Sequence, residues 1–247
     1  MERDDRASVS TFFADAAFAA YATTTLGEQA AHHARVKRLD VGDVVRLTNG
    51  AGSIALGTIV AIRKAAVDVA VESVRPVAAP FAIHLRAPIA DRDRMLMLAE
   101  KATEIGIASW QSVRFKRSMS VSPRGEGTAF AEKLRARMIA ALEQSGGAWL
   151  PRMLDEADVA AIHLEASALP IVLDAGGESL ASTMSAREEC EPVVLVGPEG
   201  GIEPDEMAKL IDAGWKCARL AQNTLRFETA GIAAVAAIRS THYGEEK

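Results

Sequence analysis

Two short segments near the carboxyl end of this 247-residue chain hold the residue types best suited to binding chemistry. The first is the apolar run VVLV at residues 193–196, which opens directly into GPEGG at residues 197–201. The run is typical of a buried strand, and the residues after it are typical of a turn that leads into a helix. Three glycines in five residues allow backbone amides to approach a ligand closely. The turn lacks the P-loop ending and the dinucleotide-fingerprint spacing, so it predicts a ligand site of another kind.

The second segment, LRFETA at residues 225–230, places Arg226 at the start of an alanine-rich stretch typical of a closely packed helix. A guanidinium there is suited to an ordinary surface ion pair, to an anionic ligand group, or to developing negative charge. The residues alone leave these roles open. Because loops after strand ends form the ligand crevice of open α/β sheets, the two segments together predict a crevice for a nucleotide-like molecule.

The rest of the chain offers no convincing nucleophile. No Ser-His-Asp set can be assembled from the sequence, and the five histidines and two cysteines show no metal-ligand or redox spacing. This pattern favours a reaction in which a cofactor supplies the reactive group and the protein positions the acceptor. We therefore expect a cofactor-dependent enzyme without a metal ion.

The formal net charge is −5, but the charge is unevenly distributed. Residues 86–149 hold 11 Lys/Arg and 7 Asp/Glu, a balance of +4, whereas residues 150–247 hold 8 and 17, a balance of −9. The basic stretch around Arg114, Lys116, Arg117 and Arg124 predicts either a phosphate-binding surface or a solvated loop. With no secretory signal and no apolar run of membrane-spanning length, the sequence predicts a soluble, cytoplasmic protein.

The elements that must position these residues fall into two parts. After a start that we expect to be poorly ordered, residues 41–75 predict short strands at 44–47, 53–60 and 67–74. Asn49-Gly50 between the first two is a strong hairpin signal. Short strands and tight turns of this kind predict a small barrel. Residues 75–80 contain two prolines and predict a linker.

Beyond the linker, the pattern alternates between strands and helices. Strands are predicted at residues 81–86, 107–115, 171–174, 193–196 and 217–220. Helices are predicted at residues 93–105, 128–145, 227–240 and from Pro204 to a stop at Gly214. This alternation predicts a mostly parallel sheet with helices on both faces, an α/β domain.

In order and spacing, several pieces of the chain resemble the SPOUT-class methyltransferases that modify N3 of a uridine in 16S ribosomal RNA. The pieces are residues 33–52, KATEIG at 101–106, EQS at 143–145, and residues 195–201 and 225–230, so the resemblance covers nearly the whole chain. It implies a PUA-like RNA-binding β-barrel at residues 1–76 and a methyltransferase domain with a C-terminal trefoil knot at residues 77–247. It also implies S-adenosylmethionine as cofactor, a homodimer, and 16S rRNA of the small ribosomal subunit as partner.

Carried over position by position, the resemblance assigns the cofactor-binding residues, while the charged segments and the implied reaction indicate two further groups. The expected cofactor-binding residues are Leu195, Gly197, Glu199, Gly200, Gly201, Leu220, Asn223, Leu225 and Arg226. The expected RNA-binding residues are His33, Arg35, Arg38, Arg114, Lys116 and Arg117. The expected catalytic residues are Arg226, Glu199 and Glu228.

The implied reaction is a direct transfer of a methyl group to N3 of uridine. The N3 proton must leave before or during the attack, which spreads negative charge onto N3 and the flanking carbonyl oxygens. Arg226 is the candidate to stabilise that charge. Glu199 and Glu228 are both candidates to accept the proton or to orient the ribose, and the sequence does not rank them.

Two positions depart from the family pattern. Gly147 stands where an arginine is usual, so one RNA or substrate contact is lost or is supplied elsewhere, with Arg152 as a candidate. Glu203 stands where the helix after the glycine turn usually has a Ser or Thr cap, and a carboxylate also suits that position.

The alternative function is a ribosome-binding or assembly module that retains the fold without methyl transfer.

Overall fold

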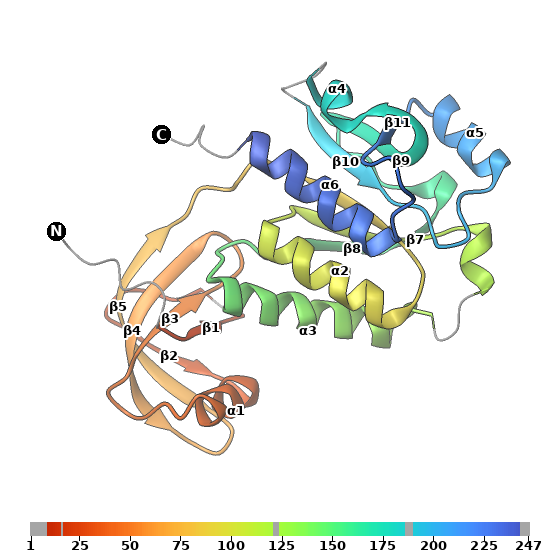
Figure 1. The fold of residues 1–247 in the computed structure, drawn as a ribbon. Coiled ribbons are helices and arrows are strands. Elements are labelled where there is room, and N and C mark those ends of the chain that lie inside the picture. Colours follow the sequence, from red (N-terminus) through yellow and green to blue (C-terminus); the bar gives the residue numbers. More distant parts are fainter. Residues whose placement is uncertain (1–8, 16, 121–123, 186–189, 243–247) are drawn as a thin grey trace. The chain divides into compact units, whose positions relative to one another are not determined.

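The structure is a computed structural model that describes residues 9–15, 17–120, 124–185 and 190–242 (Figure 1). The chain divides into two compact units. The first consists of Met1–Ala79 together with Ile139–Leu150, and the second of Pro80–Met138 and Pro151–Lys247. Each unit has its own sheet.

The first unit is built on a five-stranded curled sheet. Its strand order is β1 (Thr11–Phe13), β3 (Val44–Thr48), β4 (Ser53–Ile62), β5 (Val67–Pro76) and β2 (Thr23–Leu26). Strand β1 pairs with β3 in parallel and the other pairs are antiparallel. Alternate residues of β3, β4 and β5 form a buried apolar cluster with helix α1 (Glu28–Val36). The described strands leave β1 and β2 as edges, so the small barrel that the sequence predicts is an open half-barrel.

The predicted hairpin lies between β3 and β4. The Asn49 Oδ1 atom accepts hydrogen bonds from the backbone N of Ala51 (2.9 Å) and of Ser53 (3.0 Å), and Gly50 has φ +66°. The strands on either side are confirmed, each slightly longer than predicted. The prediction of a poorly ordered start is wrong for residues 11–13, 23–26 and 28–36, which form β1, β2 and α1, while residues 1–8 and 16 lie outside the described part.

The segment Ile139–Leu150 completes the first unit. The Glu143 carboxylate accepts a hydrogen bond from the backbone N of Phe13 (2.8 Å), and Thr48 Oγ1 donates to the carbonyl of Gly147 (2.9 Å). Trp149 Nε1 donates to the carbonyl of Val77 (3.1 Å). These hydrogen bonds join the segment to β1, to β3 and to the residues after β5.

The second unit contains a six-stranded sheet in which all pairs are parallel. Its order is β11 (Lys216–Arg219), β9 (Ala168–Ser179), β10 (Glu191–Leu195), β6 (His84–Pro88), β7 (Ser109–Arg114) and β8 (Arg152–Asp158). The predicted parallel sheet is confirmed. Strand β8 and the short helix α4 (Leu180–Ser185) were not predicted, and β9 is much longer than the predicted strand.

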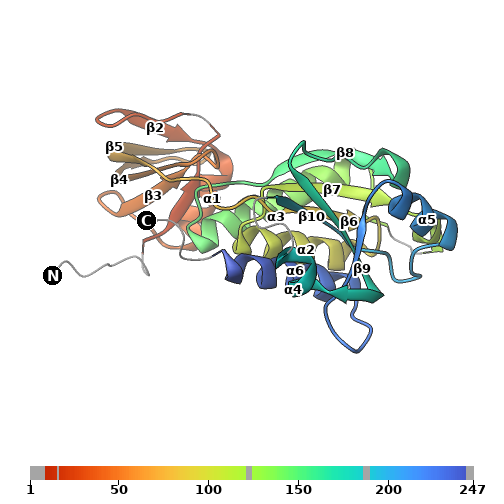
Figure 2. The same cartoon turned by 90° about the horizontal axis from the view of Figure 1, so that it is seen from above.

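Helices cover the two faces of this sheet. Helices α2 (Arg92–Ile105), α3 (Thr128–Ser145) and α6 (Phe227–Thr241) lie on one side (Figures 1 and 2). On the other face, Val193 and Leu195 of β10 pack with Leu210 of α5 (Pro204–Asp212) and with η2 (Val159–Ala161). The remaining short helix, η1 (Lys116–Ser120), follows β7. Among the described residues, no helix is long and apolar enough to cross a membrane.

The small residues of α6 have a packing role. A Cβ atom built on Gly231 would lie 2.8 Å from Leu98 Cδ1, so α6 approaches α2 as closely as it does only because this position lacks a side chain. Close packing of α6 fixes its start, where Arg226 is the N-cap residue and Glu228 lies in the first turn.

Candidate functional site

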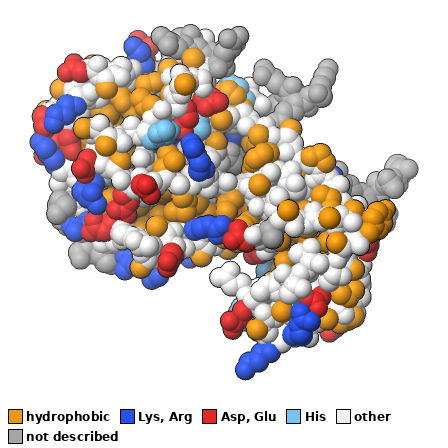
Figure 3. Space-filling model, turned by 180° about the vertical axis from the view of Figure 1, so that it is seen from behind, with side chains coloured by type: hydrophobic (Ala, Val, Ile, Leu, Met, Phe, Trp, Pro, Cys, Tyr) orange, Lys and Arg blue, Asp and Glu red, His pale blue; other side chains and the backbone are white. Residues whose placement is uncertain are grey.

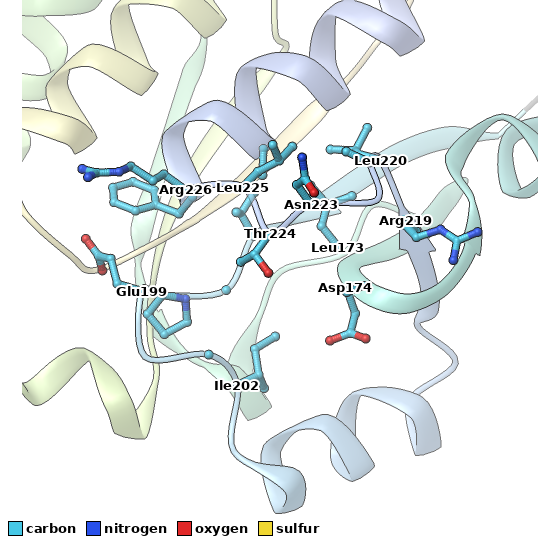
Figure 4. A pocket seen from close by; sticks show the side chains of 18 of the residues that line it. Leu173, Asp174, Glu199, Ile202, Arg219, Leu220, Asn223, Thr224, Leu225 and Arg226 are labelled. Atoms are coloured by element: carbon cyan, nitrogen blue, oxygen red, sulfur yellow. The ribbon is translucent and has the colours of Figure 1, made fainter.

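A cavity of about 490 Å³ opens at the carboxyl edge of the parallel sheet in the second unit (Figure 4). Its walls come from the loops after β10 and β11, from the start of α6, and from residues 173–175 of β9. The last group leaves the regular ladder, because β11 pairs with Val172 and next with Glu178. The segment between these partners therefore bulges out and forms a third wall.

Most of the predicted cofactor-binding residues meet at this cavity. Those that line it are Gly197, Glu199, Gly201, Leu220, Asn223, Leu225 and Arg226. Leu195 instead lies fully buried within β10, in the apolar layer under α5. Gly200 faces the Arg117 side chain, where an added Cβ would lie 3.0 Å from Arg117 Cβ. The geometry thus brings the two sequence segments to one cavity, while the binding role of each residue stays a prediction.

Two glycines of the loop are required by its shape. A Cβ on Gly197 would lie 2.9 Å from Ile202 Cγ1, closer than such atoms pack. Gly201 has φ +75°, in the left-handed region that residues with side chains rarely adopt. Glu203 stands at the N-cap of α5, where its backbone N donates to Glu206 Oε2 (3.2 Å). The loop after β10 is therefore fixed in shape at both of its ends.

One end of the cavity is strongly charged. Arg94 Nη1 lies 3.6 Å from Glu199 Oε1, and Arg94 Nε lies 4.0 Å from Glu228 Oε1. Glu228 is only 4% exposed, and its Oε2 atom has no hydrogen-bond partner among the described residues. Glu228 is also not one of the described residues that line the cavity, whereas Glu199 is. The two candidate carboxylates therefore differ: one faces the cavity and the other lies behind Arg94.

Arg226 lies at the N-cap of α6, with φ −65° and ψ 152°, and is exposed. In the described part of the chain its guanidinium has neither an ion pair nor a hydrogen bond. Figure 4 shows Arg226 and Glu199 at one end of the cavity and Asp174 and Arg219 at the other. An exposed, unpaired cation beside a cavity is available to a ligand, which favours two of the three roles that the sequence left open.

Several lining residues were missed by sequence reasoning, chiefly Arg94, Leu173 and Asp174. Arg94 carries a usable signal, because it lies in the first turn of α2, where the helix dipole disfavours a cation. The Asp91 carboxylate caps this turn by accepting a hydrogen bond from the backbone N of Arg94 (3.1 Å). The residues of β9 carry no such signal, since only the bulge brings them to the cavity.

The basic segment predicted to bind RNA is engaged with acidic side chains. Arg114 lies 3.3 Å from Glu156 and 3.4 Å from Asp158. Lys116 Nζ lies 2.6 Å from Asp205 Oδ2, and Arg117 Nε lies 2.7 Å from Glu203 Oε1. Figure 3 shows basic and acidic side chains side by side on one face of the protein. These basic side chains are thus ion-paired yet 40–57% exposed, and their contact with RNA stays a prediction.

The predicted RNA-binding residues of the first unit lie on α1 and just after it. His33 Nδ1 lies 3.5 Å from Glu143 Oε2, and Arg35 Nη1 donates to the carbonyl of Lys64 (2.9 Å). Arg38 has φ +55°, uncommon for a residue with a side chain. Burial raises the pKa of the Glu143 carboxyl, against the opposing effects of the Phe13 backbone N and His33. The role of His33, Arg35 and Arg38 in binding RNA likewise stays a prediction.

A second polar cluster lies at the amino edge of the same sheet. The buried Arg86 donates to Ser109 Oγ (2.9 Å) and pairs with Glu165 (3.1 Å). His84 Nδ1 contacts Ser109 Oγ at 2.8 Å and its Nε2 contacts Glu191 Oε2 at 3.1 Å. This is a serine–histidine–carboxylate series that the sequence did not reveal, but Ser109 is fully buried and cannot reach a substrate. Burial lowers the pKa of Arg86, and Glu165 opposes that effect.

Comparison with known proteins gives two family matches. The sequence model of a family described as an RNA methyltransferase domain matches residues 77–239, and that of an RNA methyltransferase PUA domain matches residues 26–72. Two curated relatives, from Mycobacterium bovis and Mycobacterium tuberculosis, are named Ribosomal RNA small subunit methyltransferase E. Each is 28% identical over 224 residues, which is 86% of this chain and 84% of the relative.

Solved structures share the fold over almost the whole chain. The Ribosomal RNA small subunit methyltransferase E from Neisseria gonorrhoeae, solved bound to S-adenosyl methionine, has a TM-score of 0.84 at 22% identity. A protein from Thermotoga maritima described as a predicted RNA methyltransferase has a TM-score of 0.73 at 25% identity. In both comparisons 94% of this chain and 98% of the other are covered. The half-barrel followed by a parallel-sheet domain is therefore a shared architecture.

Proposed function

Since the chain belongs to the family of RNA methyltransferases that carry a PUA domain, we propose that it methylates N3 of a uridine in 16S ribosomal RNA of the small subunit, with S-adenosylmethionine as methyl donor. The ribosomal substrate is supported by the names of the mycobacterial relatives. The cofactor is supported by the Neisseria gonorrhoeae protein, which was solved with S-adenosyl methionine bound. The choice of N3 of uridine follows from the family resemblance of the sequence motifs.

The observation that carries the proposal is that Arg226, exposed and without an ion pair among the described residues, lies with Glu199 at one end of a cavity built from two post-strand loops. The residues present fit the cofactor. The proposed apolar wall for the adenine ring consists of Leu173, Ile202 and Leu220, and Asp174 is the proposed acceptor of hydrogen bonds from the ribose hydroxyls. A cavity of about 490 Å³ lies within the range of small-molecule sites.

When bound, S-adenosylmethionine supplies an electrophilic methyl group on its sulfonium. Glu199 accepts the N3 proton of the target uridine, because it faces the cavity whereas Glu228 lies behind Arg94. Arg226 donates hydrogen bonds to the uracil carbonyl oxygen on which negative charge develops. The Glu199 carboxylate would take up the N3 proton as the methyl group passes from sulfur to N3, so charge and atoms would balance.

The first unit is the proposed RNA-binding part, consistent with its match to a PUA domain. A target base in a single-stranded loop is accessible to such a protein, since single-stranded bases can be splayed out of the stack. His33, Arg35 and Arg38 are the proposed contacts there. In the second unit Arg114, Lys116 and Arg117 contact RNA only by exchanging carboxylate partners for phosphates. The homodimer and the trefoil knot remain predictions from the resemblance.

The decisive experiment uses 16S rRNA from a strain that lacks the gene. Purified protein and isotope-labelled S-adenosylmethionine are expected to yield 3-methyluridine in a nucleoside digest, and to restore one reverse-transcription stop that the deletion removed. Methylation of another base or another RNA would overturn the proposed substrate. Binding of the small subunit without any methyl transfer would favour the assembly module instead.

A further inference from the structure

The charged end of the cavity contains a cation for which the proposed reaction gives no task. Arg94 projects from the first turn of α2 and lines the cavity, with its side chain 34% exposed. Its ion pairs with Glu199 (3.6 Å) and Glu228 (4.0 Å) are both longer than hydrogen bonds. Within the described residues the guanidinium makes no hydrogen bond. Its donors are therefore available to a ligand inside the cavity.

The buried Glu228 explains why this cation stays at the cavity wall. Its carboxylate is 4% exposed, and among the described residues only Arg94 pairs with it. An uncompensated charge at such burial is strongly unfavourable, so Glu228 holds the guanidinium in place from behind. The Glu199 contact on the cavity side is the weaker restraint, because Glu199 is 27% exposed and water competes for it.

We propose that Arg94 binds the α-carboxylate of the amino-acid portion of S-adenosylmethionine. This inference rests on the proposed function, because it takes that molecule as the ligand of the cavity. The carboxylate is the only anionic group of the cofactor, and a guanidinium binds a carboxylate through two parallel hydrogen bonds. In this arrangement Asp174 binds the ribose at one end of the cavity, and the amino-acid portion extends toward Arg94 and Glu199 at the other end. Arg226 then remains available to donate hydrogen bonds to the uracil carbonyl oxygen.

The test compares three ligands by isothermal titration calorimetry in the absence of RNA. S-adenosylmethionine and S-adenosylhomocysteine both carry the carboxylate, whereas 5′-methylthioadenosine lacks the amino-acid portion. The variant Arg94→Ala is expected to bind the first two ligands about 10- to 100-fold more weakly than the wild type, the loss of charge-assisted hydrogen bonds. Its affinity for 5′-methylthioadenosine is expected to stay within about twofold of wild type. Arg94→Lys keeps the positive charge but lacks the two parallel donors of a guanidinium, so its affinities for the first two ligands are expected to lie between those of the wild type and Arg94→Ala.

The matched control is Arg92→Ala, two residues away on the same helix. Arg92 stacks over the Phe130 ring at 5.4 Å from its centroid and is not one of the described residues that line the cavity. All three affinities are expected to be unchanged in this variant.

Equal weakening of all three ligands in both Arg94 variants would show a merely structural role and overturn the inference. Unchanged binding of S-adenosylhomocysteine would overturn it as well. In methyl-transfer assays Arg94→Ala is expected to raise the KM for S-adenosylmethionine and not that for RNA, and the opposite split would assign Arg94 to an RNA phosphate. A wild-type protein that binds none of the three ligands would instead refute the proposed function.

Discussion

The two edges of the parallel sheet use the same kinds of side chain in opposite ways. At the amino edge, Arg86 is fully buried and bonded at 2.9–3.1 Å to Ser109 and Glu165. At the carboxyl edge, Arg94 stands 3.6–4.0 Å from its two carboxylates, and Arg226 has no partner within the described residues. Groups whose hydrogen bonds are complete stabilise the fold, while groups left incomplete around a cavity are available to a ligand. Completeness of bonding, rather than residue type, separates the two edges.

The largest expected effect concerns the amino edge. Replacing Arg86 with Met leaves the Glu165 carboxylate without its closest buried partner, and we expect the free energy of unfolding to fall by about 3–5 kcal/mol in urea denaturation. Arg152 pairs with the same carboxylate at 3.2 Å but is 60% exposed. Arg152→Ala is therefore expected to cost less than about 1 kcal/mol. Equal effects of the two variants would contradict the contrast between the edges.

At the carboxyl edge the main effect is expected in turnover rather than in stability. Arg226→Ala removes the cation placed to stabilise charge on the uracil, so kcat is expected to fall about 10²- to 10³-fold. The affinity for S-adenosylmethionine, measured by calorimetry, is expected to change little, and the unfolding midpoint to stay at the wild-type value. Unchanged turnover would rule out a catalytic role for Arg226.

A smaller effect is expected from the loop after β10. Gly197→Ala places a methyl group 2.9 Å from Ile202 Cγ1, and relief of that clash must shift the cavity wall. We expect binding of S-adenosylmethionine to weaken about 10-fold. Gly27→Ala serves as control, because nothing lies within 4 Å of a Cβ at that position. Binding by Gly197→Ala at the affinity of the wild type would contradict this account.

The reactivity of the Cys217 thiol tests the effect of Asp174, which lines the cavity at the end opposite Arg226. Burial, and secondarily the charge of Asp174, raise the pKa of its thiol. Because a raised pKa leaves less thiolate at any given pH below it, alkylation by iodoacetamide at pH 8 is expected to be slower than that of a small model thiol. Asp174→Asn removes one cause and is expected to speed the reaction modestly, as followed by mass spectrometry of the Cys217 peptide. A slower reaction in that variant would disprove this account.

The smallest effect is expected for the exposed pair between Lys116 and Asp205. The two atoms lie 2.6 Å apart, and the pair raises the pKa of Lys116 and lowers that of Asp205. Both side chains are at least half exposed, so solvent screening offsets the attraction. The melting temperature of Lys116→Ala is expected to match that of the wild type within error, and a clear decrease would show that this pair resembles the amino-edge cluster.

Sequence reasoning predicted the fold where local pattern and tertiary environment agree. The helix at residues 128–145 is found at its predicted bounds, and the helix that begins with Pro204 starts where proline and acidic residues indicate. Strand β8 was missed because its sequence RMLDEAD carries three acidic residues and gives no apolar alternation. Strands β1 and β2 are only three and four residues long, too short for a periodic signal.

The site was predictable to the extent that it lies in contiguous loops. The residues of the two glycine- and arginine-containing segments were found because a post-strand turn carries its own sequence signature. Arg94 and Asp174 reach the same cavity from distant parts of the chain, through the start of α2 and the bulge of β9. No local pattern encodes such a meeting, because it depends on how the whole sheet is assembled.

The loop after β10 is shaped in part by a residue from another strand connection. Arg117, in η1 after β7, donates to the carbonyl of Gly200 (2.6 Å) and pairs with Glu203 at the N-cap of α5. Positions 117, 200 and 203 therefore constrain one another, because a substitution at one changes which residues are tolerated at the other two. Across diverging relatives these three positions are expected to vary together, so the basic character of position 117 can persist even where no RNA selects for it.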